Sequence, residues 1–120
     1  MRLTDLDPRW LMYEGRRVGF IFRSPTKRDW WQTCFVERFN LFNSGVGPWE
    51  NGTTRDSQCA IIRASAPEVG QNWQGCDNKC AWIVAGGIEK ATFETMSVTP
   101  SLDGSKGGLW HGFIRAGEAT

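Results

Sequence analysis

The sequence predicts a mainly β protein: a single-domain antiparallel β-sandwich or rolled sheet with little helix, spanning residues 1–120. About seven short segments rich in β-branched and aromatic residues recur at roughly ten-residue spacing, as in all-β domains. Fourteen glycines, about twice the average usage, would supply the tight turns between them. At 120 residues the chain can bury one core and is too short for two ordinary domains.

The N-terminal segments predict a β-hairpin. Residues 10–13 and 16–23 have strand composition and are separated by a Glu-Gly pair suited to a turn. In the second of these strands Val18, Phe20 and Phe22 fall on one face, because side chains alternate along an extended chain. A Ser-Pro pair follows and ends the strand, since proline cannot donate to a ladder.

The other strands are predicted from alternation and from the turn residues that bound them. Residues 31–37 alternate over a β-rich composition, and residues 59–63 form a short apolar run. Residues 81–85 end at a Gly-Gly pair, and residues 91–98 end before a proline. The last strand is expected over residues 109–115, before an Ala-Gly turn.

Two segments are predicted to be neither strand nor turn. Residues 40–56 contain several Asn, Gly and Pro residues and exceed the usual connection length, which indicates a mobile loop or a binding surface. Residues 65–68, Ser-Ala-Pro-Glu, have the spacing of a helix capping box with proline near the first helical position. Glycines at 70 and 75 leave room for only one or two helical turns.

Charge and hydropathy exclude several functional classes. The net charge of +1 does not favour non-specific nucleic-acid binding, which depends on many phosphate contacts. No window approaches the roughly eighteen apolar residues of a membrane span, and the N-terminus lacks the apolar stretch of a signal peptide. We therefore expect a soluble cytoplasmic protein without membrane contact, whose four cysteines remain thiols.

The cysteines and the single histidine raise the question of a metal. Cys34, Cys59, Cys76, Cys80 and His111 are enough ligands for a tetrahedral zinc site. Structural zinc sites usually show two close cysteine pairs, however, and only Cys76 and Cys80 are close. We therefore expect no cofactor. Zinc held by Cys76, Cys80 and His111, or a local disulfide between the two cysteines, are the alternatives.

His111 is the residue best suited to proton transfer at neutral pH. Alternation places its ring on the same side as Leu109 and Phe113, which favours a half-buried structural histidine. If residues 91–98 pair with the last strand, Glu94 could reach His111 across the ladder, and Asp103 is a second possible carboxylate. No serine or cysteine with a recognisable nucleophile elbow lies nearby in sequence, so enzymatic activity is not favoured.

The segment around the first proline is the clearest candidate for ligand contact. Arg23, Lys27 and Arg28 surround two adjacent indoles, Trp30 and Trp31. Cations contact phosphates and indoles stack on bases, so this mixture suits a nucleotide or a single strand. Tryptophan and arginine are also common anchors of protein interfaces. The alternative is that Trp31 belongs to the core and the cations form a solvated turn.

Short motifs near both ends carry a resemblance. They are Leu-Thr-Asp-Leu-Asp-Pro-Arg-Trp at 3–10, Arg-Val-Gly-Phe at 17–20, Thr-Phe-Glu-Thr at 92–95, Thr-Pro-Ser at 99–101, Trp-His-Gly-Phe-Ile at 110–114 and Gly-Glu at 117–118. Roughly the first 35 and the last 30 residues resemble a family of small phage and prophage proteins of uncharacterised function. Members of that family are often mislabelled as ammonia monooxygenases.

The resemblance implies a phage accessory protein in the host cytoplasm. Oxygenases need several histidine or carboxylate metal ligands, so one histidine gives that label no support. Many members carry a cysteine-rich, knuckle-like cluster after the second strand, where this chain has Ser-Pro-Thr-Lys at 24–27. Small accessory phage proteins often bind a host defence protein or sequester a nucleotide signal, so the resemblance implies non-enzymatic, counter-defence binding.

A zinc-binding protein or a His/Glu-based enzyme centred on His111 is the alternative function. The residues expected to contact a ligand or partner are Arg23, Lys27, Arg28, Trp30, Glu94, Trp110 and His111. Exposed edge strands and seven tryptophans also allow a homodimer.

Overall fold

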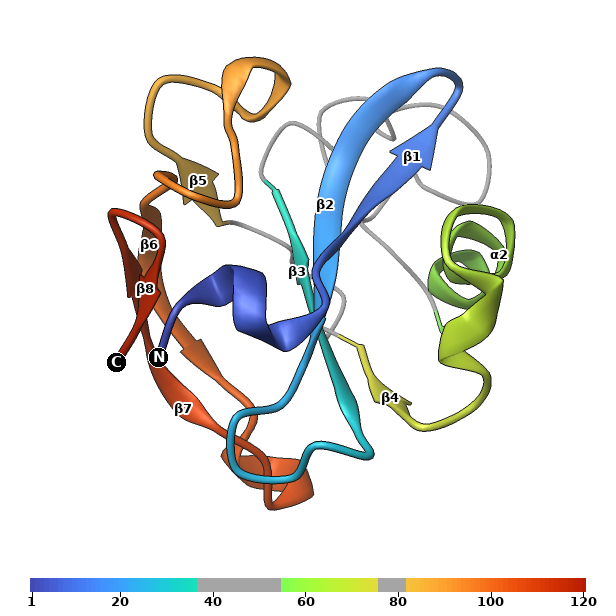
Figure 1. Cartoon of the computed structure of the whole chain (residues 1–120). Coiled ribbons are helices and arrows are strands. Elements are labelled where there is room, and N and C mark those ends of the chain that lie inside the picture. Colours follow the sequence, from blue (N-terminus) through green and yellow to red (C-terminus); the bar gives the residue numbers. More distant parts are fainter. Residues whose placement is uncertain (37–54, 76–81) are drawn as a thin grey trace.

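The computed structural model describes residues 1–36, 55–75 and 82–120, and within them the chain forms two four-stranded sheets and one α-helix (Figure 1). The first sheet has the order β1-β2-β3-β4 and the second β5-β6-β7-β8. The strands are β1 (Arg9–Tyr13), β2 (Arg16–Arg23), β3 (Trp31–Phe35), β4 (Trp73–Gln74), β5 (Ile83–Val84), β6 (Val98–Asp103), β7 (His111–Arg115) and β8 (Glu118–Ala119).

The helix is α2 (Arg55–Ser65), and the 3-10 turns are η1 (Leu3–Leu6), η3 (Pro67–Val69), η4 (Ile88–Lys90) and η5 (Ser105–Gly107). The predicted mainly β fold is thus confirmed. Two of its details differ from the antiparallel prediction, because β3 pairs with β4 in parallel and Val36 forms a parallel bridge with Trp82. Within the described residues no helix is both long and apolar enough to cross a bilayer.

The layers are sheet, sheet and helix. Side chains of both sheets share one core, including Phe20 and Phe22 from β2 and Val98 and Ile114 from β6 and β7. The other face of the first sheet packs against α2 in a second core. Figure 1 shows the same order, with β5–β8 on one side of β2 and β3 and α2 on the other. The first sheet is therefore the middle layer.

This central position explains why β2 and β3 are buried on both faces. All five residues of β3 are buried, and β2 is buried from Val18 to Phe22. Val18 does not share a face with Phe20 and Phe22 as predicted; it packs in the core beside α2. The reason is a β-bulge. Leu11 pairs with Gly19 and the next residue, Met12, pairs with Arg17, so Val18 has no partner on β1 and the alternation of β2 shifts there.

The predicted strand at residues 59–63 is wrong, because this segment lies inside α2. Its apolar run is short, and periodicity alone does not distinguish a short buried strand from a buried helical face. The buried positions Gln58, Ile61 and Ile62 follow the spacing of one helix face. After α2, Pro67 begins the short η3 turn, whereas Ser65 makes no capping bond there and accepts from the Met12 N–H instead.

Of the remaining strand predictions, one is wrong and three hold in shorter form. The strand expected at 91–98 is instead a turn, and β6 follows it at Val98–Asp103 with Pro100 inside it. Proline is accepted there because the pairing of β6 with β7 is irregular between Val98 and Leu102. The strands expected at 31–37, 81–85 and 109–115 correspond to β3, β5 and β7. Most of the predicted loop at 40–56 lies outside the described residues.

Candidate functional site

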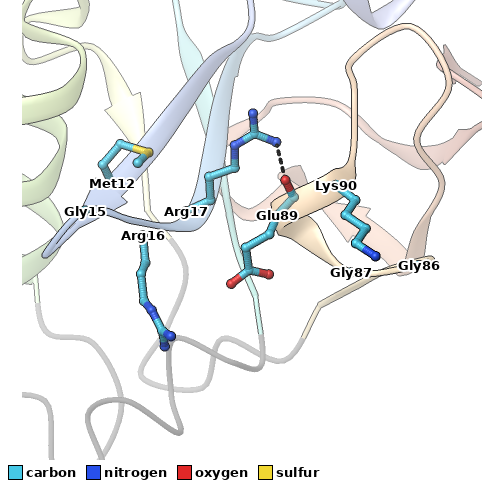
Figure 2. Close-up of a pocket in the computed structure, with 8 residues that line it drawn as sticks. All are labelled: Met12, Gly15, Arg16, Arg17, Gly86, Gly87, Glu89 and Lys90. Carbon is cyan, nitrogen blue, oxygen red and sulfur yellow. Dashed lines mark hydrogen bonds between the residues drawn. The ribbon is translucent and has the colours of Figure 1, made fainter.

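A surface cavity of about 620 Å³ lies between the β1–β2 turn and the loop that leads from β5 into η4 (Figure 2). It therefore opens at the boundary between the two sheets. Its lining residues are Met12, Gly15, Arg16, Arg17, Gly86, Gly87, Glu89 and Lys90. None of them was among the ligand-contacting residues predicted from the sequence.

Two glycine turns shape this cavity. Gly15, Gly86 and Gly87 have φ values of 75°, 80° and 94°, in the left-handed region that side chains rarely adopt. No heavy atom lies within 4 Å of where a Cβ would stand at any of the three, so the backbone there is open. Each turn is followed closely by basic residues, Arg16 after the first and Lys90 after the second.

Arg17 forms the wall between the turns. Its Nη1 donates to the carbonyl oxygens of Ile88 (3.1 Å) and Ala91 (2.9 Å), and more weakly to that of Glu89 (3.5 Å). Its guanidinium also stacks on Trp10, 4.0 Å from the ring centroid. Carbonyl oxygens at a helix end carry partial negative charge, so a cation is well placed there. Arg17 thereby ties β2 of the first sheet to η4, which follows β5 of the second.

The lining favours anions. Three cationic side chains, those of Arg16, Arg17 and Lys90, and one carboxylate, that of Glu89, line it, which gives a formal charge of +2. Figure 2 shows Arg16 and Lys90 on either side of Glu89. Arg16, Glu89 and Lys90 are exposed at the rim, whereas Arg17 is partly buried. A small phosphate-bearing molecule matches both this charge and this volume.

The sequence contains a signal for this cavity that was not used. Gly15 and the Gly86–Gly87 pair were interpreted only as turn residues that bound strands. Two glycine turns, each followed by basic residues, are a pattern that anion-binding loops use. What the sequence could not show is that the two turns, about seventy residues apart, meet in space.

His111 lies elsewhere, on the outer face of the second sheet. Its side chain is 53% exposed, so the predicted half-buried ring between Leu109 and Phe113 is wrong. The predicted alternation is correct in that Gly112 and Ile114 point inward while His111 and Phe113 point outward. The exposed face was taken for the buried one because Phe113, an apolar residue, is 40% exposed.

The carboxylate beside His111 is Asp103 and not Glu94. Asp103 is the cross-strand partner of His111, with its Oδ1 4.0 Å from Nδ1. Ser101 Oγ lies 3.3 Å from Nε2 on the other side of the ring. Glu94 stands in the turn before β6, where its carbonyl packs against Gly117, beyond the far end of β7. The proposed Glu94–His111 pair is therefore not formed.

Trp110 belongs to the core between the sheets and is 8% exposed. Its ring packs edge-on against Phe22. Its backbone N–H donates to Ser24 Oγ (3.3 Å) and to Gln32 Oε1 (3.0 Å), and its carbonyl accepts from Gln32 Nε2 (3.0 Å). Ser24 and Gln32 are buried themselves, so these bonds join the first sheet to the second. Its role is structural.

The basic turn between β2 and β3 is only partly available to a ligand. Arg23 pairs with Asp7 (Nε to Oδ2, 2.8 Å) and lies over the buried ring of Trp31, 4.4 Å from its centroid. Lys27 and Arg28 are exposed, and Lys27 stands 5.6 Å from the half-buried ring of Trp30. The alternative reading, with Trp31 in the core and the cations on a solvated turn, describes most of this segment.

Within residues 1–36, 55–75 and 82–120, no three His, Cys, Asp or Glu side chains gather closely enough to hold a metal. Cys76 and Cys80 lie outside the described residues.

Cys34 is buried in the core between the sheets, and this burial raises the pKa of its thiol well above the ordinary value. Cys59 is a half-buried thiol whose Sγ accepts from Arg63 Nη2 at 3.4 Å. Ser24, in the loop where members of the resembled family were expected to carry cysteines, accepts from the backbone N–H of Trp110.

Comparison of the chain with protein-family models, curated proteins and solved structures finds no match.

Proposed function

We propose that the protein acts by non-enzymatic binding of a small phosphate-bearing ligand in the cavity between the β1–β2 turn and η4. The observation that carries this proposal is the lining, which holds three cationic side chains and one carboxylate around about 620 Å³. Cavities of about 300–1,000 Å³ accept small-molecule ligands. Arginine binds phosphate with a planar fork of donors, and lysine adds a point charge.

A nucleotide is the ligand class that fits this chemistry and the resemblance together. Anion recognition by Arg16 and Lys90 would hold the phosphates, while Met12 is the long apolar side chain among the lining residues and offers contact to a base. With the resemblance to phage proteins, this suggests that the protein sequesters a nucleotide signal of host defence in the host cytoplasm.

The test is binding to a panel of cyclic mononucleotides, cyclic dinucleotides and inorganic phosphate, by thermal shift and calorimetry. A ligand at one hundred times its Kd stabilises the native state by about 2.7 kcal/mol, which is readily detected. Arg16→Glu and Lys90→Glu should each weaken binding at least about tenfold, since each reverses a charge at the rim. Arg17 is left intact because it holds η4 in place.

Lys27→Glu is the matched control, because it reverses an exposed cation on the β2–β3 turn, outside the cavity. It should leave the affinity unchanged. No binding by any member of the panel, or equal losses in the control and in the two rim variants, would contradict the proposal.

A second candidate function is binding of a host defence protein through the basic turn. The supporting observation is that Lys27 and Arg28 are exposed beside the half-buried Trp30, a combination common at interface anchors. Capture of a host protein that is lost in Lys27→Glu and Trp30→Ala but kept in Arg16→Glu would support it. Equal capture of the host protein by all three variants would contradict binding through the basic turn.

A further inference from the structure

We infer that Ser101 is a nucleophile activated by His111, which gives the outer face of the second sheet a reactivity toward small activated esters. This inference does not depend on the proposed function, because neither residue lines the cavity of Figure 2. It rests on the arrangement of three side chains from β6 and β7, those of Ser101, Asp103 and His111.

The register of the two strands produces this arrangement. Asp103 is directly opposite His111, and Ser101 is two residues earlier on the same strand and therefore on the same face. The two groups approach different nitrogens of the ring: Asp103 Oδ1 lies 4.0 Å from Nδ1, and Ser101 Oγ lies 3.3 Å from Nε2. The 4.0 Å separation is too long for a hydrogen bond, so Asp103 acts on the ring through its charge, which favours the proton on Nδ1 and leaves Nε2 as the acceptor that faces the hydroxyl.

Asp103 is itself held in place. Its Oδ1 accepts from both the backbone N–H and the hydroxyl of Ser105, in the turn that begins η5. These two bonds, with smaller contributions from His111 and Lys106, lower the pKa of the Asp103 carboxyl. The group is therefore a carboxylate at neutral pH, and it acts as a positioning residue for the imidazole.

The main chain of Ser101 is fixed as well, because its carbonyl accepts from the indole Nε1–H of Trp82 at 3.2 Å. The nucleophile thus stands on an anchored strand. Ser101 is itself partly exposed, and the neighbouring side chains of His111 and Asp103 are 53% and 56% exposed. A small acyl donor can approach from solvent. Because the site is open to solvent, the reaction should show a rate proportional to ester concentration and little saturation.

The step balances without any further reagent than ester and water. Ser101 Oγ forms a bond to the acyl carbon, and its proton passes to His111 Nε2. The bond from the acyl carbon to the leaving oxygen then breaks, and the proton leaves with the alcohol or phenol. Water repeats the sequence on the acyl-serine, which releases the carboxylic acid and restores the hydroxyl.

The test uses the full chain with p-nitrophenyl acetate and, separately, a fluorophosphonate. With the second reagent the Ser101 Oγ–P bond forms as the P–F bond breaks and fluoride leaves. We expect one covalent adduct per molecule by intact mass, located on Ser101 by peptide mapping. Ser101→Ala should remove it, and His111→Gln should slow its formation at least about tenfold, at the low end for a general base.

Ser65→Ala is the matched control, because this partly buried serine on α2 is remote from any imidazole in the described chain, and it should label like the native protein. Thermal unfolding checks that each variant is folded. An unmodified protein, an adduct on another residue, or an unchanged rate in His111→Gln would overturn the inference.

The positioning role of Asp103 has its own spectroscopic test. Asp103→Asn should lower the share of the Nδ1–H tautomer of His111, read from its ring nitrogen chemical shifts, and slow the labelling of Ser101. A slower labelling rate with an unchanged tautomer ratio would contradict that role, as would an unchanged labelling rate.

Discussion

At the scale of single residues, burial and neighbours decide roles that residue type leaves open. Trp110 and His111 are adjacent in sequence, yet the first is buried between the sheets and the second stands in solvent. Alternation along the strand predicts that they point to opposite faces. It does not predict which face is covered, because that depends on the other sheet. For this reason the sequence did not show that Trp110, which was predicted to contact a ligand, is buried.

Gly117 provides a stability test at this scale. Its φ is +78°, and a Cβ there would collide with the Glu94 carbonyl oxygen. Gly117→Ala should destabilise the protein by about 2–4 kcal/mol, through backbone strain and a clash with backbone that cannot move freely. Urea unfolding measures it. Gly108→Ala is the control, because φ is +73° but nothing lies within 4 Å, and it should cost about 1 kcal/mol. Equal losses of stability in Gly117→Ala and Gly108→Ala would contradict the predicted clash at Gly117.

The lowered pKa of Asp103 gives a pH-dependent prediction. A carboxyl whose pKa is lower in the folded state stabilises the fold above its unfolded pKa of about 3.9, and this contribution is lost as the pH falls through the folded pKa. Ser105→Ala removes the hydroxyl that is the main cause, so the pKa of Asp103 should rise toward the ordinary value. NMR titration of the side-chain carboxyl measures this, and an unchanged titration would show that Ser105 is not the cause.

At the scale of elements, the sequence predicted the strands better than what lies between them. The N-terminal hairpin, β3 and β7 were expected close to where they occur, because alternation and turn residues agree there. The helix was missed because the apolar run at 59–63 was assigned without the polar residues before it. The strand expected at 91–98 failed because Pro100 was taken as its end, whereas β6 contains it.

The contacts between elements are tested by Gln32, a buried amide on β3 that bonds both to the N–H and to the carbonyl of Trp110. Each of these groups has one further partner, Ser24 Oγ and the Gly104 N–H. Gln32→Leu should therefore cost about 1–3 kcal/mol rather than abolish folding. Gln71→Leu, at an exposed position, should change stability by less than about 0.5 kcal/mol. Equal losses of stability in Gln32→Leu and Gln71→Leu, measured by thermal unfolding, would show that the Gln32–Trp110 bonds do not stabilise the fold.

Arg17 is the corresponding test for η4. Lysine cannot reproduce the planar stack on Trp10 together with the bonds to the Ile88 and Ala91 carbonyls. Arg17→Lys should cost about 1.5–3 kcal/mol and speed amide exchange in η4. Arg16→Lys, one residue earlier at the exposed rim, is the control, and it should change neither the stability nor the amide exchange rates in η4. Native exchange rates in η4 of Arg17→Lys would show that the arginine does not hold this turn.

At the scale of the whole molecule, the arrangement of layers explains what the sequence could not show. The local sequence pattern of a strand does not indicate that the first sheet is covered on both faces, or that Phe113 on the outer face of the second sheet is exposed. Six of the seven tryptophans lie in the described residues, and none is fully exposed, so they serve mainly the two cores. The homodimer inferred from the tryptophans stays a prediction.

The cavity is also a property of the whole molecule, since residues 12–17 and 86–90 meet only when the two sheets pack together. The most direct test of its proposed anion binding is a titration of isotope-labelled protein with a cyclic dinucleotide and with inorganic phosphate, followed by amide chemical shifts. We predict saturable shifts centred on Gly15, Gly86 and Gly87, and their loss in Lys90→Glu. Shifts confined to the β2–β3 turn, or none in the cavity at millimolar ligand, would contradict the account.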